Sequence, residues 1–196
     1  MQLLFLVALW LQILTPAWGY GTGAPITVCE SMLPSHGVTA QSTPSPFTIV
    51  PNNTTFRNGQ SITVLINGSD YAGVLLQARS GSSTSTSALG TWGTAPTNTQ
   101  ILTCSGNNKG AITHSNENTK NNLTVFTWTP PTSGNSVFFV ATVAKSKAVY
   151  WVNVQSTMLT RAPGDTVTPG SAADPKLTVA AVLLLLPVLL MSGIQL

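Results

Sequence analysis

The sequence predicts an all-β domain built as a two-sheet sandwich. Apolar and polar residues alternate with a period of two from Thr48 onward, and no stretch shows a sustained helical period. Only 7% of the residues are charged, whereas Ser, Thr, Asn, Gly and Pro are abundant, which is typical of a loop-rich extracellular β protein. About eight short strands at this spacing favour a sandwich over a closed barrel.

The predicted strands follow one another between turn signals. The first covers residues 62–66 and ends at Asn67-Gly68, a typical hairpin turn. The Ser/Thr/Gly stretch 80–87 offers no apolar face and is predicted to be a loop. The further strands, which become richer in β-branched and aromatic residues toward the end, are expected at residues 74–79, 89–92, 101–104, 111–114, 123–128, 137–145 and 150–155.

The N-terminal residues 1–19 are predicted to be a signal peptide. Their apolar run, residues 3–14, is shorter than the roughly 20 residues needed to span a bilayer. Ala17-Trp18-Gly19 places small residues at the first and third positions of a cleavage site. Cleavage after Gly19 would make Tyr20 the first residue of the mature protein.

The C-terminal residues 177–196 form a second apolar run, which is long enough to span a bilayer. No Lys or Arg follows it in this sequence, so a cleaved glycosylphosphatidylinositol (GPI) signal is preferred and a terminal transmembrane helix is the alternative. Gly170 and Ser171 are candidate attachment residues because they are small. They lie in residues 161–176, a Pro/Thr/Gly/Ala segment that is expected to be a stalk.

The sequence contains two cysteines, Cys29 and Cys104. In an oxidising compartment an even pair indicates one disulfide, and two free thiols are the alternative. A metal site is disfavoured, because His36 and His114 do not lie at metal-ligand spacing from the cysteines.

Four Asn-x-Ser/Thr triplets agree with passage through the secretory pathway. They begin at Asn52, Asn53, Asn67 and Asn122, and none has proline in the middle position. The first two triplets overlap, so one glycan is expected there at most.

The charge distribution argues against nucleic acid as a partner. The formal net charge is +3, and no stretch concentrates Lys or Arg. Lys145, Lys147, Lys120 and Arg57 would contribute to a weak surface for anionic glycans if the fold brought them together, but scattered, solvated side chains are the preferred interpretation.

A series of short motifs follows a fixed order along the chain. The motifs are Cys29 with Met32-Leu33-Pro34 and Ser35-His36-Gly37, Phe56-Arg57-Asn58-Gly59, residues 73–79, Leu102-Thr103-Cys104, residues 111–116, residues 126–131, and residues 140–143 with Tyr150-Trp151-Val152. In this order, and across nearly all of residues 20–155, they resemble the reeler (reelin-type) domain, above all the N-terminal module of ferric-chelate reductase 1-type proteins. The domain is therefore expected to cover residues 20–160.

The resemblance implies an immunoglobulin-like antiparallel β-sandwich and supports a disulfide between Cys29 and Cys104. It also implies that Trp128 and Trp151 are core residues. Reeler modules occur in matrix proteins, in insect defence proteins and in reductases, so the fold alone does not give the function.

Catalysis is not expected of this chain. The reductases of the family use a haem in a helical membrane domain with paired axial histidines, and the terminal apolar run here has no His, Cys or Tyr. His114 and Ser115 are neighbours on a predicted strand and would point to opposite faces, so hydrogen bonds from His114 and Asn116 to a loop are the preferred interpretation. With five acidic residues in the chain, a carboxylate pair is also not expected.

The sequence therefore predicts a non-enzymatic recognition or adhesion module on the outer face of the cell membrane. No cofactor is expected, and the partners would be an extracellular protein or glycan and, through the C-terminal anchor, the membrane. The first alternative is a secreted or surface innate-defence protein that binds microbial components. The second is an accessory part of a ferric-chelate reductase system.

Overall fold

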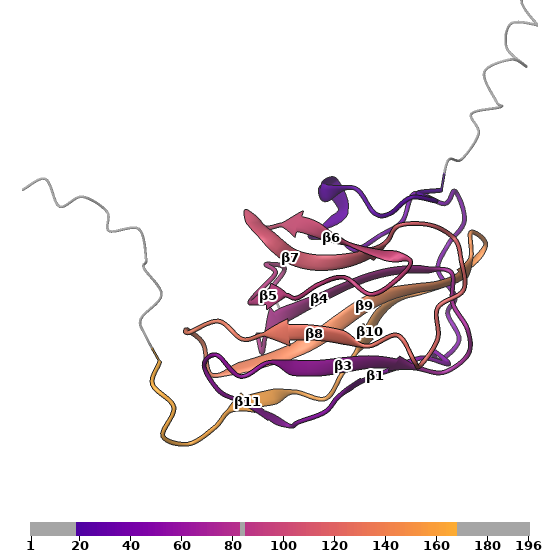
Figure 1. Cartoon of the computed structure of the whole chain (residues 1–196). Coiled ribbons are helices and arrows are strands. Elements are labelled where there is room, and N and C mark those ends of the chain that lie inside the picture. Colours follow the sequence, from indigo (N-terminus) through magenta and orange to yellow (C-terminus); the bar gives the residue numbers. More distant parts are fainter. Residues whose placement is uncertain (1–18, 83–84, 168–196) are drawn as a thin grey trace, which may run out of the picture.

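The computed structural model describes residues 19–82 and 85–167, and these form two β-sheets packed face to face (Figure 1). One sheet has the strand order β1-β3-β8-β5, and the other has the order β2-β11-β9-β4-β7-β6, with β10 paired to β9. The strands are β1 (Thr48–Pro51), β2 (Thr55–Phe56), β3 (Ile62–Asn67), β4 (Gly73–Ser80), β5 (Thr91–Trp92), β6 (Thr99–Cys104), β7 (Asn107–His114), β8 (Phe126–Thr129), β9 (Ser136–Ser146), β10 (Val149–Gln155) and β11 (Leu159–Arg161).

The smaller sheet follows the alternation read from the sequence. Ile62, Val64 and Ile66 of β3 are fully buried, and the residues between them are half-buried. β3 pairs with β1 on one side and with β8 on the other, both antiparallel. The buried face of this sheet therefore supplies one wall of the main core, as expected for a sandwich.

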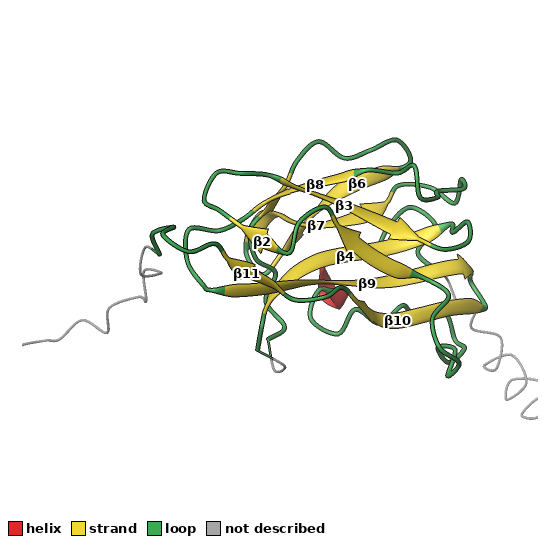
Figure 2. Cartoon of the chain, turned by 90° about the horizontal axis from the view of Figure 1, so that it is seen from below, coloured by secondary structure: helices red, strands yellow, loops and turns green. Residues whose placement is uncertain are grey.

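The larger sheet is covered on both faces, and this arrangement creates the candidate site. β4 pairs with β9 over its whole length, from Gly73 opposite Ala144 to Ser80 opposite Val137. Six consecutive residues of β4 are buried, because one face packs into the main core and the other lies under the N-terminal segment 19–36. A short 3-10 helix, η1 (Ile26–Val28), belongs to this segment and lies on the outer side of the sheet (Figure 2).

The sandwich prediction is confirmed, but the number of strands and some of their bounds differ from the predictions. Eleven strands rather than about eight lie within the described residues. β2 and β11 have two and three residues, which is too short for a recognisable period. The strand predicted at 123–128 begins at Phe126, because Asn121 and Thr124 form a turn that leaves Leu123 80% exposed.

The folded part of the chain also extends further than residue 160. Arg161 is part of β11, and its guanidinium donates to the Asp165 carboxylate at 2.7 Å. Ala162 is buried. The first residues of the predicted stalk therefore belong to the domain, because they pair with β2 and pack against its end.

The residues of the predicted signal peptide and membrane anchor lie almost entirely outside the described part of the chain. This holds for residues 1–18, for Gly170 and Ser171, and for the apolar run 177–196. Within the described part of the chain, no helix has the length and apolar character needed to cross a membrane.

Candidate recognition surface

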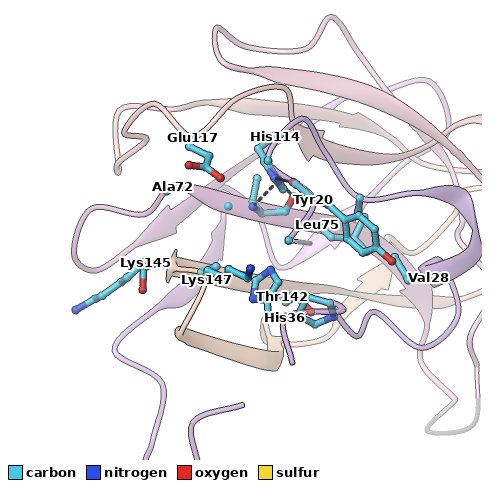
Figure 3. Close-up of a pocket in the computed structure, with 18 of the residues that line it drawn as sticks. Tyr20, Val28, His36, Ala72, Leu75, His114, Glu117, Thr142, Lys145 and Lys147 are labelled. Atoms are coloured by element: carbon cyan, nitrogen blue, oxygen red, sulfur yellow. Dashed lines mark hydrogen bonds between the residues drawn. The ribbon is translucent and has the colours of Figure 1, made fainter. Parts of the chain in front are cut away.

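A pocket of about 630 Å³ lies between the N-terminal segment and one end of the larger sheet (Figure 3). Its interior is mostly apolar, and its mouth carries a few polar and charged groups. The interior residues come from the N-terminal segment, from β4 and from β9; they include Ala24, Val28, Met32, Leu75 and Ala144. The polar groups at its border are His36, His114, Glu117, Lys145 and Lys147.

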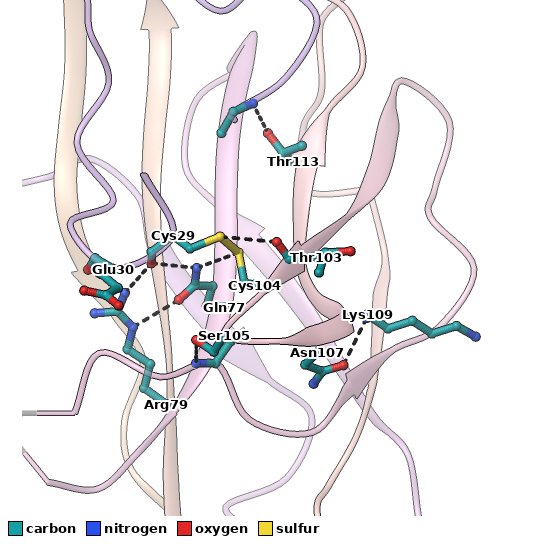
Figure 4. Close-up of a disulfide and its surroundings, with 12 residues drawn as sticks. Cys29, Glu30, Gln77, Arg79, Thr103, Cys104, Ser105, Asn107, Lys109 and Thr113 are labelled. Carbon is teal, nitrogen blue, oxygen red and sulfur yellow. Dashed lines mark hydrogen bonds between the residues drawn. A yellow bond between two sulfur atoms is a disulfide. The ribbon is translucent and has the colours of Figure 1, made fainter. Parts of the chain in front are cut away.

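The disulfide between Cys29 and Cys104 holds the N-terminal segment onto the sheet (Figure 4). This confirms the predicted pairing; the two Cα atoms are 5.6 Å apart. Two side chains of β4 also hold the N-terminal segment through hydrogen bonds to its backbone. Gln77 Nε2 donates to the Cys29 carbonyl oxygen at 2.9 Å, and Arg79 Nη2 donates to the same oxygen and to that of Glu30, both at 2.9 Å.

Two further hydrogen bonds attach the segment on either side of the disulfide. The Ala24 N–H donates to Thr113 Oγ1 at 2.9 Å, and Thr142 Oγ1 donates to the Met32 carbonyl oxygen at 2.6 Å. Both threonines point outward from the larger sheet and are buried under the segment. The segment is therefore fixed at several points, and the pocket that it covers is preformed.

His114 is a structural part of the pocket wall. Its Nε2 lies 2.6 Å from the Tyr20 carbonyl oxygen, and its Nδ1 lies 3.3 Å from the Val74 backbone nitrogen. One neutral tautomer satisfies both contacts, with Nε2–H donating to Tyr20 and Nδ1 accepting from Val74. Asn116 likewise donates to Asn98 Oδ1 at 3.0 Å. The structure thus agrees with the hydrogen-bonding interpretation of His114 and Asn116.

His36 forms another part of the wall beside the loop that joins β9 and β10. Its ring packs edge-to-face on Tyr150, with the ring centroids 5.0 Å apart. Burial lowers the pKa of His36, and the Lys147 ammonium lowers it further, although a hydrogen bond with the Lys147 backbone opposes them. The imidazole is therefore neutral at pH 7, and it adds no charge to the pocket.

Lys120 is neither part of a glycan-binding surface nor a solvated side chain, so both interpretations of the sequence are wrong for this residue. Only 2% of the residue is exposed. Its ammonium group donates to the carbonyl oxygens of Ala72 at 2.7 Å, Asn116 at 3.0 Å and Asn118 at 2.7 Å. Burial lowers the pKa of the amine. Lys120 thus ties the loop after β7 to the start of β4.

The remaining predicted cations are exposed, but the fold does not bring them all together. Arg57 follows β2, which pairs with β11 near the start of β9. Lys145 lies about nine residues further along β9, or roughly 30 Å away in an extended strand. Lys145 and Lys147 both line the pocket mouth, but the Lys145 side chain points to the face of β9 that carries Val143, where its ammonium lies 5.8 Å from the Trp151 ring centroid. The predicted four-residue surface is therefore not assembled.

Replacing Lys120 with methionine is expected to lower the free energy of unfolding by about 3 kcal/mol, because three carbonyl oxygens lose their donor. Urea denaturation followed by tryptophan fluorescence measures this change. Lys109→Met is the matched control: Lys109 is exposed on the β6–β7 hairpin, so its loss should change stability by no more than about 0.5 kcal/mol. Equal stability of the two variants would contradict the structural role of Lys120.

The glycosylation sites stay predictions, and the structure gives their accessibility. Asn53 and Asn122 are exposed in loops. Asn52 is exposed too, but its Oδ1 accepts a hydrogen bond from the Thr63 N–H at 3.0 Å. Asn67 is half-buried at the end of β3. Asn53 is therefore the better acceptor of the overlapping pair.

The pocket itself was not predicted from the sequence. Its lining residues are ordinary apolar side chains from segments that are far apart along the chain, so no motif marks them. Among the described residues, no group of three or more His, Cys, Asp or Glu side chains is placed to hold a metal ion.

Comparison with known proteins identifies the fold and the relatives. The family model described as "Reeler domain" matches residues 27–167. The crystal structure of the human F-spondin reeler domain superposes with a TM-score of 0.52 at 17% sequence identity, and the match covers 64% of this chain and 94% of that chain. This structural likeness supports the immunoglobulin-like sandwich fold, and at this sequence identity it shows the fold alone.

The sequence relatives fall into two groups that differ in length. "Putative ferric-chelate reductase 1" of Danio rerio is 36% identical over 83% of this chain, but the match spans only 29% of that protein. "Ferric-chelate reductase 1" of Bos taurus is 31% identical over 72% of the chain and is matched over 24% of its length. "Putative defense protein Hdd11" of Hyphantria cunea is 41% identical over 70% of the chain and is matched over 86% of its length. The chain belongs to the reeler domain family.

Proposed function

We propose that this chain is a non-enzymatic recognition or adhesion module on the outer face of the cell membrane, and that a protein or glycan ligand binds at the N-terminal segment. The observation that carries this proposal is a set of apolar side chains exposed on a rigid frame. Ile26, Leu33 and Val38 are 63%, 53% and 47% exposed, and all three belong to or directly follow the segment held by the disulfide. Exposed apolar groups on a preorganised surface are typical of binding sites.

The non-enzymatic part of the proposal rests on the contacts of the polar groups in the pocket. Both His114 nitrogens face backbone groups, and the Thr142 hydroxyl donates to a backbone carbonyl. These side chains position the N-terminal segment rather than a substrate. The name ferric-chelate reductase belongs to proteins of which the match covers less than a third, so an accessory part in such a system is the weakest of the three functions.

The recognition surface can be tested with the full chain displayed on cells. Cells that carry the wild type should adhere to partner cells or to surfaces coated with matrix protein or heparin, and the double variant Ile26→Asp/Val38→Asp should reduce this adhesion several-fold. Met158→Asp is the control, because Met158 is also 50% exposed but lies outside the N-terminal segment. Equal adhesion by the two variants, at equal surface abundance, would exclude this surface.

A defence function is the second candidate, and one observation favours it. The relatives named as defense proteins from Hyphantria cunea, Bombyx mori and Antheraea mylitta are matched over 86%, 81% and 88% of their own lengths. The function therefore predicts that the protein sediments together with intact bacteria or fungi. If the wild type stays in the supernatant with every microbe tested, the proposal of a defence function is excluded.

Membrane attachment through a GPI anchor at Gly170 or Ser171 predicts release by phosphatidylinositol-specific phospholipase C. Treated cells should lose most of the surface protein to the medium, because the enzyme cleaves the lipid anchor. A control chain in which residues 177–196 are replaced by an established transmembrane helix should stay on the cells. Retention of the wild type would instead support the transmembrane alternative.

N-linked glycosylation of the secreted domain predicts a loss of mass on treatment with peptide-N-glycosidase F. Up to three glycans are expected, because Asn52 and Asn53 share one site. Asn53→Gln and Asn122→Gln should each remove one step of the mass shift, since both side chains are exposed. An unchanged mass in either variant would show that the site concerned is not used.

A further inference from the structure

We propose that the pocket binds a single-chain amphiphile with an anionic head group, with the alkyl chain in the apolar interior and the head at Lys147. This assigns a small-molecule ligand to the pocket, in addition to the macromolecular ligand proposed for the exposed side chains of the N-terminal segment. The pocket volume of about 630 Å³ lies within the range of small-molecule sites.

The interior selects an alkyl chain because its lining is mostly apolar, and the Thr142 and His114 side chains in it are already paired. The Thr142 hydroxyl donates to the Met32 carbonyl oxygen, and His114 contacts Tyr20 and Val74 through its two nitrogens. A sugar in this space would leave its hydroxyl groups without partners, which costs free energy for each group. Val28, Met32 and Leu75 offer an apolar surface instead, and burial of an alkyl chain there is favourable by about 0.8 kcal/mol per methylene.

The charges at the mouth select the head group. Lys147 borders the pocket on one side, and Glu117 borders it on the side of His114, whereas the Lys145 side chain points away from it (Figure 3). The Lys147 ammonium and the Glu117 carboxylate lie on different sides of the mouth, so an anionic head group is attracted toward Lys147 and repelled from Glu117.

The walls of the pocket make binding possible without a large change of shape. The disulfide and the hydrogen bonds of Gln77, Arg79, Thr113 and Thr142 fix the segment that covers it. Little conformational entropy is therefore lost when a ligand enters, and most of the burial energy contributes to affinity.

Photo-crosslinking on cells that display the full chain tests the proposal. Two probes carry a diazirine in a single alkyl chain: one is a free fatty acid, and the other is a lysophospholipid with an anionic phosphate head. Labelling of peptides that contain residues 24–36 or 72–75 by either probe is the expected result, and the ratio of the two identifies the source of the anion. Dodecanoate should compete with the labelling, and dodecyltrimethylammonium, which has the same chain length and the opposite charge, should not.

Matched charge reversals complete the test. Lys147→Glu should weaken labelling about tenfold, while Lys109→Glu, the same change at an exposed lysine outside the pocket, should leave it unchanged. Leu33→Asp, on the exposed border of the pocket, should also weaken it. Absence of labelling in these peptides, or equal labelling of the two charge reversals, would overturn the proposal. Adhesion through Ile26 and Val38 would be unaffected by that outcome, so the two proposals fail separately.

Discussion

Replacing both Cys29 and Cys104 with alanine is expected to lower the free energy of unfolding by about 4 to 5 kcal/mol. The disulfide closes a loop of 75 residues, and in the chain-entropy model opening a loop of this size stabilises the unfolded state by that amount. For a domain of this size the loss corresponds to a decrease of about 10 to 20 °C in the melting temperature, measured by differential scanning calorimetry.

The reduced wild type is the control for this prediction, since it loses the bond but keeps the sulfur atoms. It should melt near the temperature of the double variant, and the variant should be insensitive to reductant. A second effect follows from the position of the bond: without it, the N-terminal segment is held over the pocket by apolar packing and by hydrogen bonds such as those from Gln77 and Arg79. The double variant should therefore also show weaker amphiphile labelling. A variant that melts within a few degrees of the oxidised wild type would contradict the prediction.

The sequence predicts the core of the sandwich well, because core-facing residues recur at every second position of its long strands. In β3 every second residue faces the core, so Ile62, Val64 and Ile66 stand out from their neighbours. The same is true of the aromatic residues near the centre, and the two tryptophans implied by the family resemblance, Trp128 and Trp151, are both buried. Burial of this kind is repeated along the chain and is therefore visible without a structure.

The short strands depend on partners that are far away in the sequence. β2 consists of two residues and pairs in parallel with β11, more than a hundred residues later. Thr55 and Phe56 carry no period of their own, and their conformation is set by contact with Thr160 and Arg161. Such elements follow from the tertiary fold rather than from local preference.

The candidate site was not predictable for the same reason. Lys120 looks like any surface lysine in the sequence, but the loop after β7 folds back so that three carbonyl oxygens surround its ammonium group. The pocket arises where the N-terminal segment crosses the end of β4 and β9. Its lining is defined by that crossing, and no spacing in the sequence records it.

Replacing Trp128 with alanine is expected to lower the free energy of unfolding by about 3 to 5 kcal/mol, the usual cost of removing a large aromatic side chain from a core. Trp128 lies on β8 of the smaller sheet and is fully buried. Its ring packs edge-to-face on Phe139 of the larger sheet, at 5.2 Å between centroids, and also on Phe56 at 6.4 Å. The ring therefore joins the two sheets directly, and urea denaturation measures its contribution.

A pair of phenylalanine variants separates the packing of Trp128 from its hydrogen bond. Trp128 Nε1 donates to the Leu89 carbonyl oxygen at 2.9 Å, whereas Trp92 Nε1 has no partner among the described residues. Both indoles are at most 1% exposed, so replacement by phenylalanine removes a similar volume at each position. Trp128→Phe should therefore be less stable than Trp92→Phe by about 1 kcal/mol, the net value of one buried hydrogen bond. If the two variants are equally stable, packing alone accounts for the role of Trp128, and the bond to Leu89 contributes nothing measurable.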